Sequence, residues 1–258
     1  MTPPGAGTAP RDWDAATYHR VSHLQLAWGL EVLERLPLRG DETVLDAGCG
    51  TGRVTEHLIE RLPHGRVIAV DGAPSMVEKA RETVGDRAEV RLSDLAELTV
   101  EEPVDVIFST AVFHWLPDHD LLFRRLHDAL KPCGRLVAQC GGHGNVSKLA
   151  RAITRVRERE AFQRHFGDWQ SPWNFQGPKE TAERLNRAGF AEIECGLENK
   201  TVRPDNAHGF LKAVSLGPYM EELPDEERDP FVSAVLELMP EPLTLEYVRL
   251  NIDARRPE

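Results

Sequence analysis

Short apolar runs alternate with stretches of helical periodicity along most of this chain. Such runs indicate buried strands, whereas apolar residues spaced three or four positions apart indicate amphipathic helices. The runs predict seven strands, of which the first ends at Val44–Leu45 and the others lie at 66–70, 88–92, 104–109, 135–140, 191–202 and 243–252. The helical spacing predicts helices within 15–36, after Gly52, from Pro74, at 121–130, at 178–188 and within 205–240.

This alternation of strand and helix predicts an α/β fold, with a doubly wound, mostly parallel seven-stranded sheet and a helical cap. We expect a disordered tail at 1–12, followed by a core at 13–142 and 178–258 that begins with cap helices. Residues 143–177 and 205–240 interrupt the alternation as cap insertions. We expect both insertions to gather over the carboxyl ends of the strands, where open α/β sheets bind ligands.

A glycine-rich turn, DAGCGTG at 46–52, follows the first strand. Backbone without Cβ atoms can approach a ligand closely there. A dinucleotide-binding loop has the spacing G-x-G-x-x-G; counted from the first glycine, its third glycine would fall on Arg53, but the glycine comes one residue earlier, at Gly52. The acidic residue after the second strand, Asp71, can accept hydrogen bonds from two ribose hydroxyls. The turn therefore indicates a cofactor with a ribose and disfavours an NAD-linked oxidoreductase.

The pattern D-x-G-x-G-x-G resembles motif I of the class I S-adenosylmethionine-dependent methyltransferases, and the resemblance extends over residues 40–140. It implies S-adenosylmethionine as cofactor and S-adenosylhomocysteine as product. It assigns the ribose hydroxyls to Asp71, the adenine face to Met76 and the exocyclic amine to Asp94, and the backbone of Thr110–Ala111 would face the methionine part. The cofactor-binding residues that it implies are Asp46, Gly48, Gly50, Gly52, Asp71, Gly72, Met76, Ser93, Asp94, Leu95, Thr110 and Ala111.

Three further stretches, WDAATYHRV, FHWLPDHD and LVAQCGG, resemble the trans-aconitate methyltransferase group, which methylates carboxylates of small acids. Separately, Gln25 and His114–Trp115 resemble an arrangement in plant and insect carboxyl methyltransferases that holds the acceptor carboxylate. This resemblance implies that Gln25 and the indole N–H of Trp115 donate to the carboxylate oxygens. His114 would help to close the site, and Tyr18 and Trp173 complete the expected contacts to the acceptor.

Methylation of a carboxylate demands little of the protein. A carboxylate has a reference pKa of about 4 and is ionised at neutral pH, so the protein must only align it with the methyl group and exclude water. Transfer to a phenol or an amine profits from a nearby base, and His114, His119, His143 and Tyr18 are candidates. O-, N- or C-methylation of a secondary metabolite therefore stays open, as does a protein that binds the cofactor without transferring methyl.

The net charge of −11 bears on both partners and acceptor. The chain has no strongly basic block that could neutralise phosphates, so we expect no nucleic-acid substrate. The same charge repels a multiply charged anion unless basic side chains act locally, and Arg20, Arg155 and Lys212 lie in the expected cap. Trp169, Trp173 and Phe175 indicate an apolar pocket wall, which fits a hydrophobic or mixed acid at least as well as aconitate.

The four cysteines form no C-x-x-C pair, so we expect no metal site. This cysteine usage is typical of a reduced, cytoplasmic protein. No apolar run approaches the roughly twenty residues that span a bilayer, and the N-terminal MTPPGAGTAP lacks the pattern of a secretory signal. We expect a cytoplasmic enzyme with a small-molecule acceptor and no membrane partner, as a monomer or a homodimer.

Overall fold

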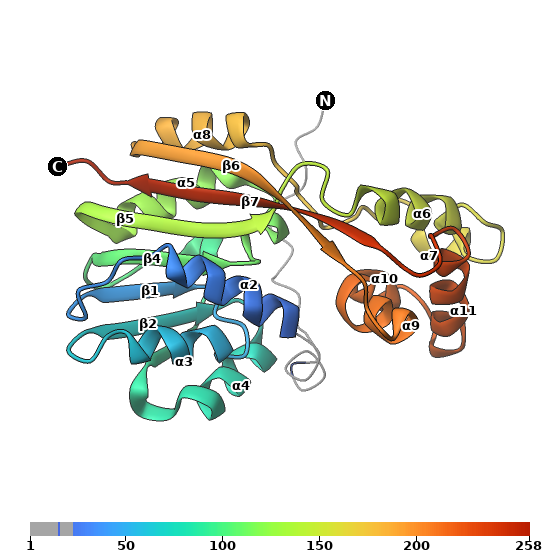
Figure 1. Cartoon of the computed structure of the whole chain (residues 1–258), viewed down its shortest axis with the longest axis horizontal. Coiled ribbons are helices and arrows are strands. Elements are labelled where there is room, and N and C mark those ends of the chain that lie inside the picture. The colour runs from blue at the N-terminus through green and yellow to red at the C-terminus, as the bar shows by residue number, and fades with distance from the viewer. Residues whose placement is uncertain (1–14, 16–22) are drawn as a thin grey trace.

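The computed structural model describes residue 15 and residues 23–258, and it contains one sheet with helices on both faces (Figure 1). The strands are β1 (Thr43–Ala47), β2 (Arg66–Asp71), β3 (Glu89–Leu92), β4 (Val104–Thr110), β5 (Leu130–Gly141), β6 (Ala191–Val202) and β7 (Leu245–Arg255). Their order is β3-β2-β1-β4-β5-β7-β6. Strand β7 runs antiparallel to β5 and β6, and the other neighbours are parallel. This arrangement confirms the predicted doubly wound, mostly parallel seven-stranded sheet.

Helices cover both faces of the sheet (Figure 1). One face carries α2 (His23–Glu34), α3 (Arg53–Glu60) and α4 (Pro74–Val84), and the other carries α5 (His119–Ala129) and α8 (Pro178–Arg187). Helices α4 and α8 both begin with proline, which fits the first turn because its N–H has no intrahelical partner. The strand order reverses between β1 and β4, so the carboxyl ends of these strands form the crevice in which such sheets bind ligands.

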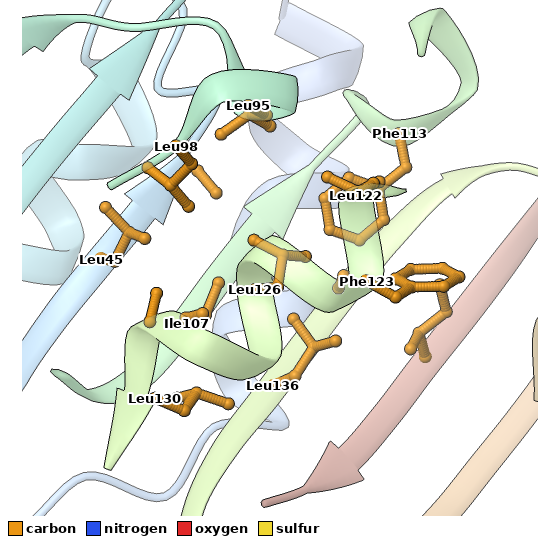
Figure 2. Packing of buried hydrophobic residues seen from close by; sticks show 14 of the residues in the cluster. Leu45, Leu95, Leu98, Ile107, Phe113, Leu122, Phe123, Leu126, Leu130 and Leu136 are labelled. Atoms are coloured by element: carbon orange, nitrogen blue, oxygen red, sulfur yellow. The ribbon is translucent and has the colours of Figure 1, made fainter. Parts of the chain in front are cut away.

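Alternate residues of the central strands serve opposite faces of the sheet, as the strand periodicity requires. Leu45 of β1 and Ile107 of β4 pack on the same side as Leu126 of α5 (Figure 2). Their sequence neighbours Val44 and Val106 belong to the cluster beneath α2 and α3. All five side chains are buried. The continuous apolar runs of the sequence therefore reflect strands that are covered on both sides.

The remaining helices form a separate group beyond the carboxyl ends of the parallel strands, which we call the helical lobe (residues 143–177 and 203–244; Figure 1). It contains α6 (Ser147–Arg157), α7 (Gln163–Phe166), α9 (Ala207–Phe210), a π-helical turn (Leu211–Ser215), α10 (Gly217–Glu221) and α11 (Asp225–Leu236). Ile153 and Phe231 from the lobe share a buried cluster with Leu245 and Tyr247 of β7. Further along the same strand, Ile252 belongs to the main core. Strand β7 is thus part of both clusters.

The strand predicted at 135–140 begins earlier than expected. In β5, Leu130 pairs with Val104 and the next pair joins Arg135 to Val106, so the ladder contains an irregularity. The N–H of Cys133 donates to the main-chain oxygen of Arg256 at 2.9 Å, which ties this irregular part to the end of β7. A contact between segments so far apart in the sequence leaves no local signal.

Two kinds of feature are absent from residue 15 and residues 23–258. No helix there is long and apolar enough to cross a membrane. No group of three or more His, Cys, Asp or Glu side chains is placed to hold a metal ion.

Candidate active site

A cavity of about 380 Å³ lies where the carboxyl ends of the parallel strands meet the helical lobe. Loops after β1, β2 and β3 supply one end of its wall, and α2, β7 and the lobe supply the other. The loop after β4 contributes to both ends. Of the residues predicted from the sequence, the cavity brings together Gln25, Gly48, Gly50, Asp71, Gly72, Met76, Asp94, Leu95, Thr110, Ala111, His114, Trp115 and Trp173. These positions lie up to 148 residues apart in the sequence (173 − 25) and meet at one site.

The turn after β1 passes close to the loop that follows β4. The N–H groups of Gly48 and Cys49 both donate to the main-chain oxygen of Val70, at 2.8 and 2.9 Å. Gly48 has a φ of +88°, and a Cβ atom added there would lie 2.1 Å from the side chain of Val112. Glycine is therefore required at position 48 for two reasons, backbone conformation and close approach.

Asp71 lies at the carboxyl end of β2 with both carboxylate oxygens oriented by the backbone. One oxygen accepts the N–H of Gly50 and the other accepts the N–H of Ala73, each at 2.9 Å. A carboxylate oxygen can accept more than one hydrogen bond. The orientation of Asp71 and its place on the cavity wall suit a contact to the two hydroxyls of a ribose.

The neighbouring part of the wall is suited to an adenine ring. Asp94 accepts the N–H of Ala96 at 2.9 Å and so caps the short helix Leu95–Glu97. Met76 and Leu95 are buried and line the cavity, which gives flat apolar surfaces beside a carboxylate acceptor. Apolar walls with one hydrogen-bond acceptor match the face and the exocyclic amine of adenine.

Four of the residues predicted for the site are not on the described wall of the cavity. Asp46 is buried behind the glycine turn, where its carboxylate accepts the hydroxyl of Thr55 at 2.7 Å. Burial, together with the charge of Asp71, raises the pKa of Asp46 to about 7 despite that hydrogen bond. Gly52 is the N-cap of α3, and Ser93 directly precedes Asp94 without forming part of the wall. Tyr18 lies outside the described residues.

The other end of the cavity carries Gln25, His114 and Trp115. Gln25 lies on α2, and its Oε1 is buried with no hydrogen-bond partner among the described residues. His114 and Trp115 lie on a single turn of 3₁₀ helix directly after β4. The structure thus brings to one cavity the three residues that are expected to hold the acceptor carboxylate. We call Gln25, His114 and Trp115 the carboxylate clamp.

His114 is a neutral imidazole with a defined tautomer. It is buried, and burial, with a smaller contribution from the positive charge of Arg249, lowers its pKa well below the ordinary value. The N–H of Gly141 donates to Nδ1 of His114 at 3.2 Å. Because Nδ1 accepts a hydrogen bond, we assign the ring proton to Nε2, which makes His114 a hydrogen-bond donor.

Aromatic rings continue the wall from His114 into the helical lobe. The ring centre of His114 lies 5.1 Å from that of Trp115 and 5.6 Å from that of Phe175, which in turn stacks on Trp173 at 5.5 Å. Asn174 joins the two segments, because its N–H donates to the main-chain oxygen of His114 at 2.8 Å. These rings form an apolar, water-excluding boundary at the acceptor end of the cavity.

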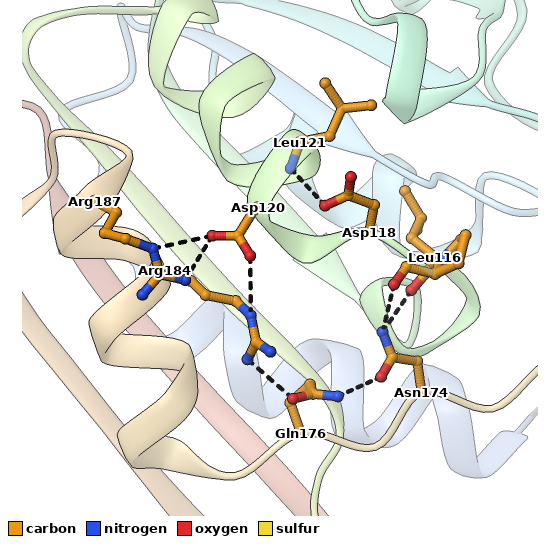
Figure 3. A network of polar contacts seen from close by, with 9 residues as sticks. Leu116, Asp118, Asp120, Leu121, Asn174, Gln176, Arg184 and Arg187 are labelled. Atoms are coloured by element: carbon orange, nitrogen blue, oxygen red, sulfur yellow. Dashed lines mark hydrogen bonds and ion pairs between the residues drawn. The ribbon is translucent and has the colours of Figure 1, made fainter. Parts of the chain in front are cut away.

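Side-chain contacts also tie this aromatic segment to the loop after β4 and to α8 (Figure 3). The amide of Asn174 donates to the main-chain oxygen of Leu116 at 2.9 Å. Gln176 hydrogen-bonds to Asn174 and accepts from Arg184 at 2.9 Å, and Arg184 pairs with Asp120 at 3.4 Å. The polar network therefore fixes the segment that presents Trp173 to the cavity.

Several residues of the cavity wall were not predicted from the sequence, among them Trp28, Tyr247 and Arg249. Arg249 is 4% exposed, and its guanidinium lies 5.0 Å from the ring centre of Trp28. The signal for these β7 residues was the strand alternation, which places Arg249 on the same face as Leu245 and Tyr247. An arginine that follows Leu245 and Tyr247 on one strand face indicates a buried charge.

Among the described residues considered as bases or as cations, His119, His143, Arg155 and Lys212 are not on the cavity wall. His119 is buried beside it, and its Nε2 lies 2.8 Å from the main-chain oxygen of Phe113. His143 and Arg155 are exposed, and Lys212 pairs with Asp229 at 2.6 Å. Arg20 lies outside the described residues.

The family described as "Methyltransferase domain" matches residues 44–134. A trans-aconitate 2-methyltransferase of Methylobacterium radiotolerans is 38% identical over 238 residues, which cover 86% of this chain and 87% of that protein. A trans-aconitate 2-methyltransferase of Escherichia coli is 28% identical over 264 residues, 96% of this chain and 99% of that protein.

Among solved structures, the phosphoethanolamine N-methyltransferase 2 of Haemonchus contortus in complex with S-adenosyl-L-methionine has a TM-score of 0.62. It is 20% identical, and the match covers 95% of this chain and 57% of that chain. This similarity shows a shared fold.

The cavity fits the cofactor of these enzymes. The open space where a Cβ atom of Gly50 would lie, the oriented carboxylate of Asp71 and the apolar surface with Asp94 match the three chemical parts of S-adenosylmethionine. Together with the sequence identity over most of the chain, this fit settles the family. The chain belongs to the class I S-adenosylmethionine-dependent methyltransferases, in the group of the trans-aconitate methyltransferases.

Proposed function

We propose that this methyltransferase esterifies a carboxylate of a small acid, with trans-aconitate as the first acceptor to test. The observation that carries the proposal is the hydrogen bond from Gly141 to Nδ1 of His114. This bond occupies the lone pair that a general base would need, and the pKa of His114 is lowered as well. A carboxylate acceptor needs no base, because it is already ionised.

The acceptor end of the cavity offers neutral hydrogen-bond donors to such a carboxylate. In this proposal the amide of Gln25, the Nε2–H of His114 and the indole N–H of Trp115 hold its oxygens. Donors fixed on α2 and on the turn after β4 cost little reorganisation when the acceptor binds. The aromatic boundary of Phe175 and Trp173 excludes water from the same end.

The protein's contribution to the reaction is binding and alignment. S-adenosylmethionine supplies a methyl group on a positively charged sulfur. One oxygen of the acceptor carboxylate forms a new C–O bond to the methyl carbon. The C–S bond breaks at the same time, and the electron pair of the C–S bond stays with the sulfur. No proton moves, and the opposite charges of carboxylate and sulfonium both disappear. The enzyme therefore raises the rate by holding the two reactants in line.

The relatives support a small acid as acceptor, because two of them are named trans-aconitate 2-methyltransferases and align with most of this chain. Transfer to a phenol or an amine is less well supported. Besides His114 and Arg249, the acceptor end carries the titratable side chain of Tyr247, and burial raises the pKa of Tyr247. A phenol with a raised pKa is a poor proton acceptor at neutral pH.

The same proposal covers the setting of the enzyme. We place it in the cytoplasm as a monomer or homodimer with no nucleic-acid partner, in line with its net charge of −11 and four free cysteines. We assign the insertions 143–177 and 205–240 to a cap on the site, supported by the lobe residues Trp173 and Val214 on the cavity wall.

A turnover assay with a panel of carboxylic acids, phenols and amines tests the proposal, with products identified by mass. We expect acids to gain one methyl group and to lose it again under mild alkali, as esters do. Methylation confined to phenols or amines would contradict the proposal and leave the cofactor site intact. No product from any acid, with S-adenosylhomocysteine still bound, would equally count against a carboxylate acceptor.

A further inference from the structure

We propose that Arg249 selects acceptors with a second carboxylate and holds that second carboxylate while the first is methylated. The inference rests on the proposed function and names the residue that defines the substrate class. Arg249 is buried in β7 and lines the cavity. It is the one Lys or Arg among the described residues of the cavity wall.

The guanidinium of Arg249 is held in a fixed orientation. Its Nε donates to Oε1 of Gln139 at 3.3 Å, and the amide nitrogen of Gln139 donates to Asn251 at 2.8 Å. The plane lies over the ring of Trp28, at 5.0 Å from its centre. An oriented guanidinium recognises a carboxylate through two parallel N–H bonds and loses less conformational freedom than a lysine would.

Arg249 lies beside the proposed clamp for the reacting carboxylate. It pairs with Gly141 across β5 and β7, and Gly141 is the residue whose N–H donates to His114. Trp28, beneath the guanidinium, is one turn away from Gln25 on α2, so both side chains lie on one face of that helix. A short acid could therefore reach the clamp with one carboxylate and Arg249 with another.

The charge change of the reaction explains why a cation suits the second carboxylate. The reacting carboxylate loses its negative charge as the ester forms, so a guanidinium on it would stabilise the ground state more than the transition state. Neutral donors avoid this penalty. A second carboxylate keeps its charge throughout, so a guanidinium can bind it with equal strength in substrate, transition state and product.

A local cation also answers the electrostatic problem of an acidic protein. A net charge of −11 repels anions at long range, but salt screens such repulsion beyond about 10 Å. A buried guanidinium on the cavity wall is screened much less. Its charge already acts on its neighbours: it adds to the burial that lowers the pKa of His114, and it opposes the burial that raises the pKa of the Cys140 thiol.

The test compares acids that differ in the number of carboxylates: trans-aconitate with three, fumarate and glutaconate with two, and crotonate with one. Wild-type enzyme, Arg249→Met, Arg249→Lys and the control Arg255→Met are assayed with each acid. Arg255 lies on the same strand and pairs with Glu192 at the surface. Binding of S-adenosylhomocysteine to each variant reports that the fold and the cofactor site are intact.

We expect the wild type to prefer its best polyacid over crotonate. In Arg249→Met the KM for that polyacid should rise by about 10- to 100-fold, as for the loss of hydrogen bonds to a charged group, with kcat changed by less than about threefold. The KM for crotonate should change far less than the KM for the polyacid, and Arg249→Lys should recover part of the affinity. A loss of kcat shared equally by polyacids and crotonate, or no change with any acid, would overturn the inference.

A binding measurement keeps this inference separate from the proposed function. The complex with S-adenosylhomocysteine is titrated with trans-aconitate, which needs no turnover. Weaker binding of trans-aconitate to Arg249→Met than to Arg255→Met supports the proposed contact of Arg249 with a carboxylate, even if no acid is esterified. Equal binding in both variants would overturn it, whatever the turnover assay shows. If Arg249→Met does not fold, the comparison of wild type with Arg249→Lys and of polyacids with crotonate still decides.

Discussion

The main-chain N–H of Gly141 lies 3.2 Å from Nδ1 of His114, and this contact sets the tautomer of the neutral imidazole. A protonated His114 would carry hydrogen on Nδ1 and lose the bond to Gly141, and burial opposes the positive charge further. The depressed pKa means that His114 stays neutral at neutral and alkaline pH and becomes protonated only in acid.

The first prediction concerns the dependence of kcat/KM on pH. Between about pH 6 and pH 9 the rate with an acid should not respond to His114, because both the imidazole and the acceptor carboxylate keep one protonation state there. Initial rates in buffers of constant ionic strength check this. Asp46 is the control, since its pKa of about 7 could add an inflection of its own. An inflection that survives in Asp46→Asn would point to a catalytic base.

The second prediction concerns Trp115. Trp115→Ala should lower kcat/KM for an acid by about 100-fold, because it removes a donor that aligns the reacting carboxylate with the methyl group. The affinity for S-adenosylhomocysteine should change by less than about threefold, because Trp115 lies at the acceptor end of the cavity. Steady-state kinetics and calorimetric titration measure the two effects.

Trp115→Phe separates the roles of the Trp115 side chain, because it keeps a ring and removes the N–H. Trp169→Ala is the matched control in the helical lobe, since Trp169 packs on Tyr219 and is not on the cavity wall. Equal losses of rate and of cofactor affinity in Trp115→Ala would remove Trp115 from the acceptor site.

The third prediction concerns Gly48. Gly48→Ala should destabilise the protein by about 1–3 kcal/mol, because the new methyl group meets Val112 and the residue has a positive φ. The affinity for S-adenosylhomocysteine should fall with it. Gly50→Ala is the matched control: Gly50 has a φ of +54°, but a Cβ atom there would meet nothing within 4 Å. The double variant Gly48→Ala/Val112→Ala should recover the steric part, and chemical unfolding measures all three.

The fourth prediction uses the raised pKa of Asp46. The folded-state pKa of about 7 lies above the ordinary value of 3.8, so folding favours the protonated carboxyl. The stability from this group is fully present below about pH 4 and is lost as the pH rises toward 7, by up to about 1.4 kcal/mol per pH unit. Asp46→Asn, which imitates the protonated form, should match the wild type in acid and exceed it at about pH 8.

Urea unfolding of both proteins at several pH values measures the Asp46 effect. The Thr55 hydroxyl can still donate to the amide oxygen of Asn, so that contact is kept. The opposite result would be a wild type that becomes more stable relative to the Asp46→Asn variant as the pH rises from about 5 to about 8. In that case the carboxyl would have to be ionised in the folded protein.

The sequence was most informative where local pattern and position coincide. The glycine turn, Asp71 and Asp94 follow strands whose ends must meet in a doubly wound sheet, so the cofactor end of the cavity could be predicted. The acceptor end is different. Gln25 and His114 became recognisable through resemblance, but Arg249 and Trp28 come together through pairing of β7 with β5 and packing of α2, which no local spacing encodes.

Strand β7 connects the two hydrophobic clusters of the molecule. Leu245 lies in the cluster of the helical lobe and Ile252 in the main core, with Arg249 between them on the cavity wall. A rigid strand that runs through both clusters transmits strain from one to the other, so the lobe cannot unfold without exposing one end of β7. Lobe and core should therefore melt in one cooperative transition. Any opening of the site should take place at the chain segments that flank α6 and follow β6, while β7 keeps its register.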